Sequence, residues 1–320
     1  MDLLISGSTA YDRIMDFPGK FSDHILPNKI HTLNVSFGLT TLNIQYGGTA
    51  GNITYNLGLL REKSYLISQV GNDFKNYKAW LLEHHVNLRY VRVLKQSLSA
   101  TAHIITDQAD NQITGFYFGA MGTAALKDKS ILQRITRQVT TRPCWALLAA
   151  GNVDDMLTLA KLYQRKGVPY IFDPGQQTVW LTAEQIKTIV RGATMLIVND
   201  YELALIEKKL ATTKQKLMQQ LDRLIVTLGE HGAEWHVAGK KFIMPIAKPK
   251  QVVDPTGAGD AYRAGLLKGL VEDWDVETTG RVAALCATYA IEHYGTQRHN
   301  YSPKQFQDRF YKVFKRKITL

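Results

Sequence analysis

The chain has 320 residues, enough for one large α/β domain or two smaller ones, and its 45% apolar residues can form a sizeable core. Its two cysteines, Cys144 and Cys286, lie far apart in apolar surroundings without metal-ligand spacing, which predicts buried free thiols in a cytoplasmic protein. The start of the chain lacks the pattern of a signal peptide, no apolar run reaches the roughly 18 residues of a membrane span, and the net charge is +11.

The first 45 residues combine one clear strand with a long irregular stretch. The apolar residues 3–5 predict a buried strand, and the Ser-Gly-Ser sequence that follows ends it in a small-residue turn. Asp12 stands in the next loop, where an aspartate alone is usually a turn former. Residues 17–45 contain prolines, glycines and short β-prone pieces such as 33–37, so we expect an irregular or short-stranded excursion there.

Residues 47–172 alternate between helical and strand patterns. A glycine-rich turn at 47–52 (GGTAGN) leads into a helix that ends at Leu60. Further strands are predicted over 66–70, 146–150 and 168–172, and helices over 76–84 and 154–166. This alternation indicates βαβ units and a mainly parallel sheet. Asp173 follows the last of these strands, at the carboxyl end where ligands bind in open α/β sheets.

Residues 100–118 interrupt this alternation with a predicted hairpin. Two β-rich runs, 101–106 and 113–118, flank the polar residues 107–112. Two such runs around a polar turn are typical of paired antiparallel strands.

Two more strand-and-turn units follow. A buried strand at 195–198 precedes Asn199-Asp200-Tyr201-Glu202, which on its own predicts a capped helix start. A second strand, 224–228, precedes the glycine turn 229–232 (GEHG).

The stretch 251–261 (QVVDPTGAGDA) predicts a strand, a sharp turn and a helix. Asp254-Pro255 marks the turn, and Thr256 is a good residue to cap the helix. Residues 257–259 then offer backbone N–H groups with almost no side chain around them, which favours binding of an anion such as phosphate. Asp260 lies in the same first turn, where its carboxylate can take a proton from a hydroxyl that attacks the phosphate.

The segment 298–320 explains most of the positive charge. It contains seven Lys or Arg residues and one Asp, a net +6 out of +11. Phe306, Phe310 and Phe314 recur every four residues, so the basic residues form the solvated side of a terminal helix. No zinc-finger spacing or RNA-binding aromatic motif accompanies them, so we expect no nucleic-acid partner.

Four of these motifs together resemble the ribokinase-like (pfkB) family of carbohydrate and nucleoside kinases. They are 47–52, 199–202, 227–232 and, most specifically, 254–267. The sequences around residues 7–19 and 34–37 are similar to the bacterial adenosine-kinase-like branch. Walker A and protein-kinase motifs are not found in the sequence.

The resemblance implies an α/β fold with a mainly parallel central sheet, helices on both faces and a small β lid. It implies a single kinase domain over 1–320, with the lid inserted from about 13–46 and 98–120. It also implies Asp260 as the catalytic base and an anion hole formed by Gly257, Ala258 and Gly259. The implied substrate ligands are Ser8, Asp12, Ser36, Gly48 and Asn52. The implied ATP contacts are Asn199, Thr227, Gly229 and Gly232, with Glu202 binding Mg²⁺ through water.

The expected activity is transfer of the γ-phosphoryl group of ATP to a primary hydroxyl, and adenosine is the expected acceptor. Lid aromatics, Phe37, Phe116, Tyr117 and Phe118, can stack on a purine or simply hold the lid together. The alternatives are a sugar or sugar-phosphate kinase of the same family and, more remotely, a nucleotide- or nucleic-acid-binding protein without catalysis. Activation by a monovalent cation such as K⁺ and a homodimeric state both stay open.

Overall fold

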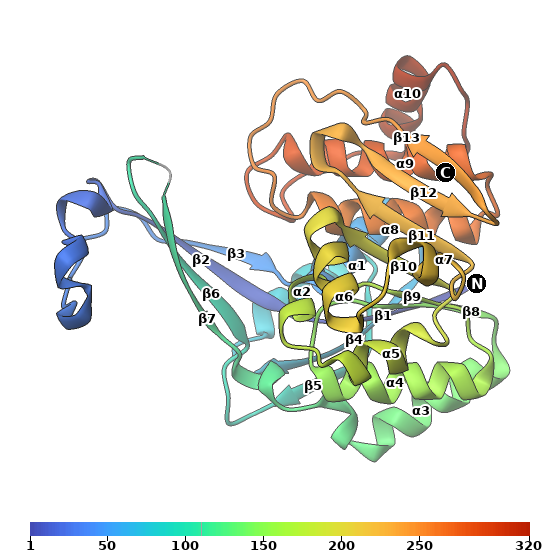
Figure 1. Cartoon of the computed structure of the whole chain (residues 1–320), viewed down its shortest axis with the longest axis horizontal. Helices are drawn as coiled ribbons and strands as arrows, with labels where there is room; N and C mark the ends of the chain where they lie inside the picture. The colour runs from blue at the N-terminus through green and yellow to red at the C-terminus, as the bar shows by residue number, and fades with distance from the viewer. Residues whose placement is uncertain (110) are drawn as a thin grey trace.

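The computed structural model describes residues 1–109 and 111–320 and contains two β-sheets of unequal size (Figure 1). In the described part of the chain, the larger sheet has nine strands. Their spatial order is β13 (Lys240–Met244), β12 (Ala233–Val237), β11 (Arg223–Thr227), β10 (Met195–Asn199), β9 (Tyr170–Phe172), β8 (Cys144–Leu148), β1 (Asp2–Ser6), β4 (Ser64–Gly71) and β5 (Asn87–Leu94). All pairs from β5 to β11 are parallel, whereas β12 and β13 pair antiparallel at one edge.

Helices cover both faces of this sheet, as its strands require. Leu3 and Ile5 of β1 belong to one buried core and Leu4 to the other, because successive side chains of a strand point to opposite faces. The first core is closed by α1 (Thr49–Leu59), α2 (Lys75–Glu83), α8 (Ala258–Val271), α9 (Val276–Ile291) and α10 (Pro303–Phe314). The second is closed by α3 (Lys129–Thr141), α4 (Val153–Lys166), α5 (Ala183–Val190), α6 (Asp200–Leu210) and α7 (Lys214–Met218).

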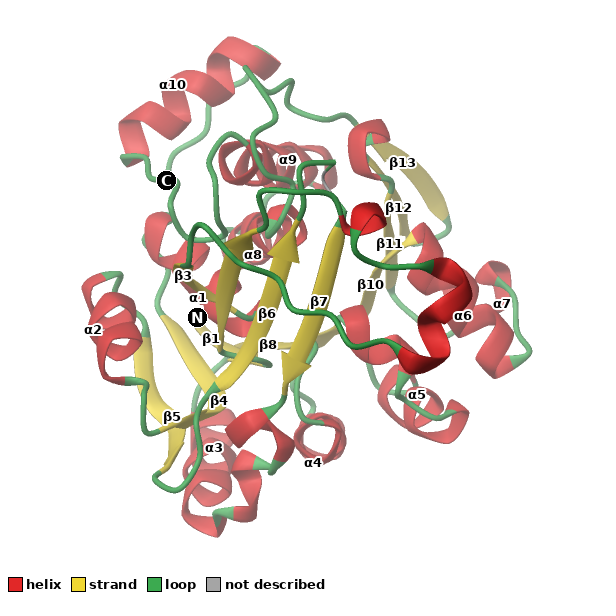
Figure 2. Ribbon diagram, turned by 90° about the vertical axis from the view of Figure 1, so that its left-hand side faces the viewer, coloured by secondary structure: helices red, strands yellow, loops and turns green. Residues whose placement is uncertain are grey.

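The smaller sheet projects from the body and forms the lid (Figures 1 and 2). Its order is β3 (Asn43–Gly47), β2 (Ala10–Asp16), β6 (Ala100–Thr106) and β7 (Gln112–Tyr117). β2 and β6 are parallel, and the two outer pairs are antiparallel. The predicted hairpin is therefore β6 and β7, although Asp110 in its turn lies outside the described residues.

The excursion between β2 and β3 forms the far tip of the lid and contains short 3₁₀ helices, η1 (Phe21–Asp23) and η2 (Pro27–Thr32). Residues 33–37 form no strand, contrary to their β-prone composition. Phe37 instead packs against Phe17 and Phe21. Four more 3₁₀ helices are η3 (Gly119–Gly122), η4 (Ala125–Lys127), η5 (Gly175–Val179) and η6 (Gly229–His231).

The mainly parallel sheet, the helices on both faces and the lid confirm the expected fold class. β8 begins two residues earlier than predicted, because Cys144 and Trp145 pair with the start of β1. In α10, Phe306 and Phe310 are buried and Phe314 packs against the core, so the predicted apolar face is confirmed. Within the described residues, the helices are all too short or too polar to cross a membrane.

Candidate active site

A cleft of about 1590 Å³ lies between the lid and the carboxyl ends of the parallel strands. Side chains that directly follow β1, β8 and β9 line it, as do residues at the ends of β10 and β11. Its other walls are the lid strands and the beginning of α8. This is the edge at which open α/β sheets bind their ligands.

The strand predicted at the start of the 251–261 stretch is not formed, because residues 251–253 are irregular. The turn before α8 leaves the start of that helix without a side-chain cap. Gly257 is the N-cap and has φ 80°, a left-handed conformation that favours glycine. The prediction that Thr256 caps the helix is wrong, because the N–H of Thr256 itself donates to Asp254 Oδ1 at 2.9 Å. Gly257 and Gly259 line the cleft, and the N–H groups at the start of a helix lack partners within it, so this part of the wall suits an anion.

Ala258 differs from its two neighbours. It is not among the described residues that line the cleft, and its N–H donates to the carbonyl of Pro255 at 3.3 Å. The structure therefore brings two of the three predicted anion-hole residues to the cleft wall.

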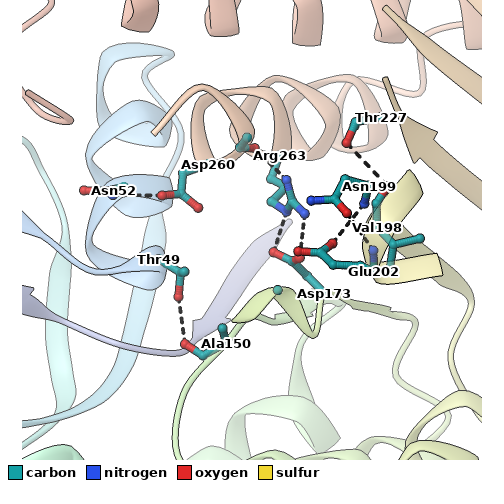
Figure 3. Close-up of polar contacts among 12 residues, drawn as sticks. Thr49, Asn52, Ala150, Asp173, Val198, Asn199, Glu202, Thr227, Asp260 and Arg263 are labelled. Carbon is teal, nitrogen blue, oxygen red and sulfur yellow. Dashed lines mark hydrogen bonds and ion pairs between the residues drawn. The ribbon is translucent and has the colours of Figure 1, made fainter. Parts of the chain in front are cut away.

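Asp260 lies in the first turn of α8 and lines the cleft (Figure 3). Asn52 of α1 donates from Nδ2 to Asp260 Oδ2 at 2.8 Å. Burial raises the pKa of Asp260 to about 7, against the opposing effects of the Asn52 hydrogen bond and the Arg263 charge. A carboxylate with a pKa near neutrality suits a general base.

Arg263, one helical turn after Asp260, forms a buried ion pair that the sequence analysis did not predict. Its guanidinium donates to both carboxylate oxygens of Asp173, from Nη2 to Oδ1 at 2.6 Å, and the two side chains are only 8% and 4% exposed. Nη1 also donates to the carbonyl of Gly259 at 3.0 Å. Burial disfavours the charge of Arg263, but the carboxylates of Asp173, Asp260 and Glu202 outweigh it and raise the pKa of Arg263.

This pair fixes the first turn of α8 to the end of β9. A Cβ atom at Gly259 would stand 2.9 Å from Arg263 Nη1, so glycine leaves room for the guanidinium. The signal in the sequence was an arginine among the small and apolar residues of Ala-Tyr-Arg-Ala-Gly, next to a predicted catalytic aspartate.

Asn199, Glu202, Thr227 and Gly229 line the opposite end of the cleft. Asn199 and Glu202 form a reciprocal capping box at the start of α6, which confirms the capping interpretation of this motif. Gly232 is outside the described cleft lining. Its φ is 84°, and a Cβ atom there would stand 2.1 Å from the Met244 carbonyl, so it serves the turn between β11 and β12.

The predicted substrate ligands Ser8, Asp12, Gly48 and Asn52 all line the cleft. Ser8 Oγ accepts a hydrogen bond from the N–H of Thr49 at 2.9 Å, so it also tethers the start of α1. Burial, and next the carboxylate of Asp254, raise the pKa of Asp12 to about 6.

Gln45 is a cleft residue that the sequence analysis missed. It lies opposite Asp12 in the pairing of β2 with β3, so both side chains are on the same face of the lid sheet. Gln45 is only 7% exposed. No motif contains it, and only the register of the lid strands places it in the cleft.

Ser36 is the one predicted substrate ligand that the structure leaves apart from the others. It is exposed in the irregular part of the excursion and is not among the described residues that line the cleft. Of the lid aromatics, Phe116 and Phe118 line the cleft, whereas Tyr117 between them is not among the described lining residues. Phe37 packs in the aromatic cluster of the excursion, which confirms the structural interpretation for that residue.

Comparisons with known proteins show which family the chain resembles. Residues 20–303 match the pfkB family of carbohydrate kinases. The nucleoside kinase of Methanocaldococcus jannaschii is 32% identical over 237 residues, which cover 73% of this chain and 75% of that protein. The ribokinase of Bacillus subtilis is 24% identical over 243 residues, covering 73% of this chain and 76% of that one.

A solved structure is similar over nearly the whole length. The Burkholderia thailandensis nucleoside kinase in complex with inosine has a TM-score of 0.85 and 33% identity, and the match covers 98% of this chain and 99% of that one. The sequence match, the fold and the cleft lead to the same conclusion: the chain belongs to the pfkB family of carbohydrate kinases and is an ATP-dependent kinase that phosphorylates an alcohol group.

Proposed function

We propose that this kinase transfers the γ-phosphoryl group of ATP to the primary hydroxyl of a nucleoside, with adenosine as the preferred acceptor and AMP as product. The observation that carries this proposal is the charge of the cleft. Among the described residues that line it, Arg263 alone has a cationic side chain, and its charge is paired with Asp173. Asp12 and Asp16 of β2 bring carboxylates to the lid side.

These charges favour a nucleoside over a phosphorylated sugar. A phosphosugar needs Arg or Lys near its phosphate, and Asp12 would repel that phosphate. A carboxylate suits the vicinal diol of ribose, because it can accept two hydrogen bonds. Phe116 and Phe118 then supply rings on which a purine can stack. The nucleoside kinases among the similar proteins support this class, and the inosine complex makes inosine the natural second acceptor to test.

In the proposed reaction, the oxygen of Asp260 that Asn52 does not hold takes the proton of the acceptor hydroxyl. The hydroxyl oxygen forms a bond to the γ-phosphorus, and the bond from phosphorus to the β–γ bridging oxygen breaks, so ADP leaves with the electron pair. The N–H groups at Gly257 and Gly259 hold the negative charge that develops on the phosphoryl oxygens.

The residues of the cleft also fit a Mg²⁺ ion that arrives with ATP. Asp200 and Glu202 line the ATP end of the cleft, and carboxylates are hard ligands that suit a hydrated Mg²⁺. Within the described residues, His, Cys, Asp and Glu side chains form no cluster of three that could hold a metal by itself. Glu202 and Asn199 would hold the ion, which would neutralise phosphate charge in a cleft rich in carboxylates.

The decisive experiment is a competition at equal acceptor concentrations. ADP release should give a kcat/KM for adenosine well above those for ribose, fructose and fructose 6-phosphate, and the Asp260→Asn variant supplies the background. A higher value for inosine would replace adenosine but keep the nucleoside class. A preference for a free or phosphorylated sugar would overturn the nucleoside proposal and favour the sugar-kinase alternative.

A further inference from the structure

A chain of three hydrogen bonds, of which the central one is buried and the outer two are partly buried, runs from Trp80 to the carboxylate of Asp260. The indole Nε1 of Trp80 in α2 donates to Gln297 Oε1 at 3.0 Å. Gln297, in the segment between α9 and α10, donates from Nε2 to Asn52 Oδ1 at 2.9 Å. Asn52 in turn donates to Asp260 at 2.8 Å. Gln297 and Asn52 are only 3% and 4% exposed.

The direction of every bond in this chain is fixed by its two ends. An indole N–H can only donate, so the carbonyl end of Gln297 must face Trp80 and its NH₂ end must face the site. Tyr77 fixes the same orientation, because its hydroxyl donates to the Gly47 carbonyl at 2.9 Å and accepts from Gln297 Nε2 at 2.5 Å. Gln297 therefore presents N–H groups to Asn52, and Asn52 must turn its own NH₂ toward Asp260.

Without this chain, the Asn52 amide could rotate by half a turn. Its carbonyl oxygen would then face the carboxylate of Asp260, and the repulsion would favour the protonated form. A protonated Asp260 cannot take the proton of the acceptor.

We infer that Gln297 and Trp80 are positioning residues that fix the orientation of Asn52 and so keep the catalytic carboxylate ionised. The inference rests on the proposed role of Asp260 as the base. Neither Gln297 nor Trp80 is among the described residues that line the cleft, so neither touches the substrate. They reach Asp260 through Asn52, and Gln297 also donates to the hydroxyl of Tyr77.

Other charged groups around Asp260 stay in place when this chain is broken. Arg263 of α8 favours the ionised form, whereas Asp173 after β9 and Asp12 of β2 favour the protonated form. Tyr77 of α2, which accepts from Gln297, carries no charge, because burial raises its pKa well above the ordinary value. A variant of Gln297 is therefore expected to shift the titration of Asp260, because the charges around Asp260 stay the same.

The test is the pH dependence of kcat/KM for the nucleoside at saturating Mg·ATP. Gln297→Met removes both ends of the amide at similar volume, and Trp80→Phe removes only the donor that orients it. The acid limb of the profile should move to higher pH, by about one pH unit for Gln297→Met and by less for Trp80→Phe, so activity near pH 6 falls about tenfold while activity near pH 9 changes little.

Gln138→Met is the matched control. Gln138 is also a buried glutamine, and it lies in α3, which covers the other face of the sheet. Its Nε2 donates to Asp2 Oδ2 at 2.8 Å. This variant should lower stability without moving the acid limb. An acid limb that stays in place in both Gln297→Met and Trp80→Phe overturns the inference. If Gln297→Met does not fold, the profile of Trp80→Phe is the test. Failure of the proposed base is a different result, in which Asp260→Asn keeps near wild-type turnover.

Discussion

The start of α8 and the lid sheet face each other across the cleft, but they are held in place in different ways. In α8, nine of the fourteen residues are buried, and Asp260 and Gly259 are bonded to Asn52 and Arg263. In β7 of the lid, every residue is exposed, including Phe116 at 42%. The groups proposed to act on the phosphate are thus built into the core, whereas Phe116, proposed to stack on the acceptor, lies on an exposed strand of the lid.

This difference separates two properties of the enzyme. Changes near α8 should alter turnover and stability, because its contacts are buried and mutually dependent. Changes on the cleft face of the lid should alter acceptor affinity and leave turnover and stability nearly intact.

The largest effect is expected for Asp260→Asn. It keeps the shape of the side chain but cannot take a proton, so kcat should fall by about 10²- to 10⁴-fold while ATP binding stays unchanged. Steady-state kinetics and calorimetric titration with ATP would measure the two quantities. Near wild-type turnover would remove Asp260 from the mechanism.

Arg263→Met should destabilise the contact between α8 and the end of β9. It leaves the carboxylate of Asp173 buried without its partner, which should lower the free energy of unfolding by about 3–5 kcal/mol in urea titrations. Lys187→Met is the control, because it removes an exposed pair with Glu184 and should cost less than about 0.5 kcal/mol. Equal losses in the two variants would contradict the comparison.

Asp260 should also make stability depend on pH. Its folded-state pKa of about 7 is raised above the ordinary value of 3.8, so its contribution is fully present below pH 4 and is lost as the pH rises through 7. An asparagine at position 260 does not titrate, so the variant does not lose this stability as the pH rises. The stability of Asp260→Asn relative to the wild type should therefore be greater at pH 8 than at pH 4, on the order of 2–4 kcal/mol. A pH-independent difference would mean that the carboxylate is not buried as described.

On the lid, Phe116→Ala should raise the KM for the nucleoside about 5- to 100-fold with little change in kcat, because stacking on a base contributes about 1–3 kcal/mol. Tyr117→Ala is the matched control, since Tyr117 is the next residue of the same exposed strand but does not line the cleft. Equal effects of the two substitutions would exclude specific stacking.

The smallest effect is expected for Thr256→Ala. A true N-cap loses about 1 kcal/mol on such a change, but the side chain of Thr256 does not cap α8, so stability should change by less than about 0.5 kcal/mol. Loss of a full kilocalorie in thermal or chemical unfolding would restore the capping interpretation.

The parts of the site that the sequence predicted are those that depend on neighbours along the chain. Gly257 is required by a left-handed turn and Asp260 by its place in the first helical turn, so a short motif contains both. The buried strands of the large sheet could be predicted for the same reason, because each apolar run is visible in its own stretch of sequence.

The parts that the sequence did not predict depend on contacts between distant segments. Arg263 meets Asp173 across 90 positions, and Gln297 meets Asn52 across 245. The place of Gln45 follows from the register of two lid strands. The antiparallel strands β12 and β13 were also missed, because the apolar pattern is weaker at this end of the sheet, where β13 is the edge strand.

The segment 296–299 has a consequence for how the protein is made. Thr296 bonds to the carbonyl of Tyr46, Gln297 to Asn52, and His299 to Asn56, all within the first fifth of the chain. During synthesis these early polar groups are made long before their partners leave the ribosome, because domains are synthesised from the N-terminus onward. These contacts can therefore form only after residue 299 has left the ribosome, and a chain truncated before residue 296 would keep those groups buried without partners or fail to bury them.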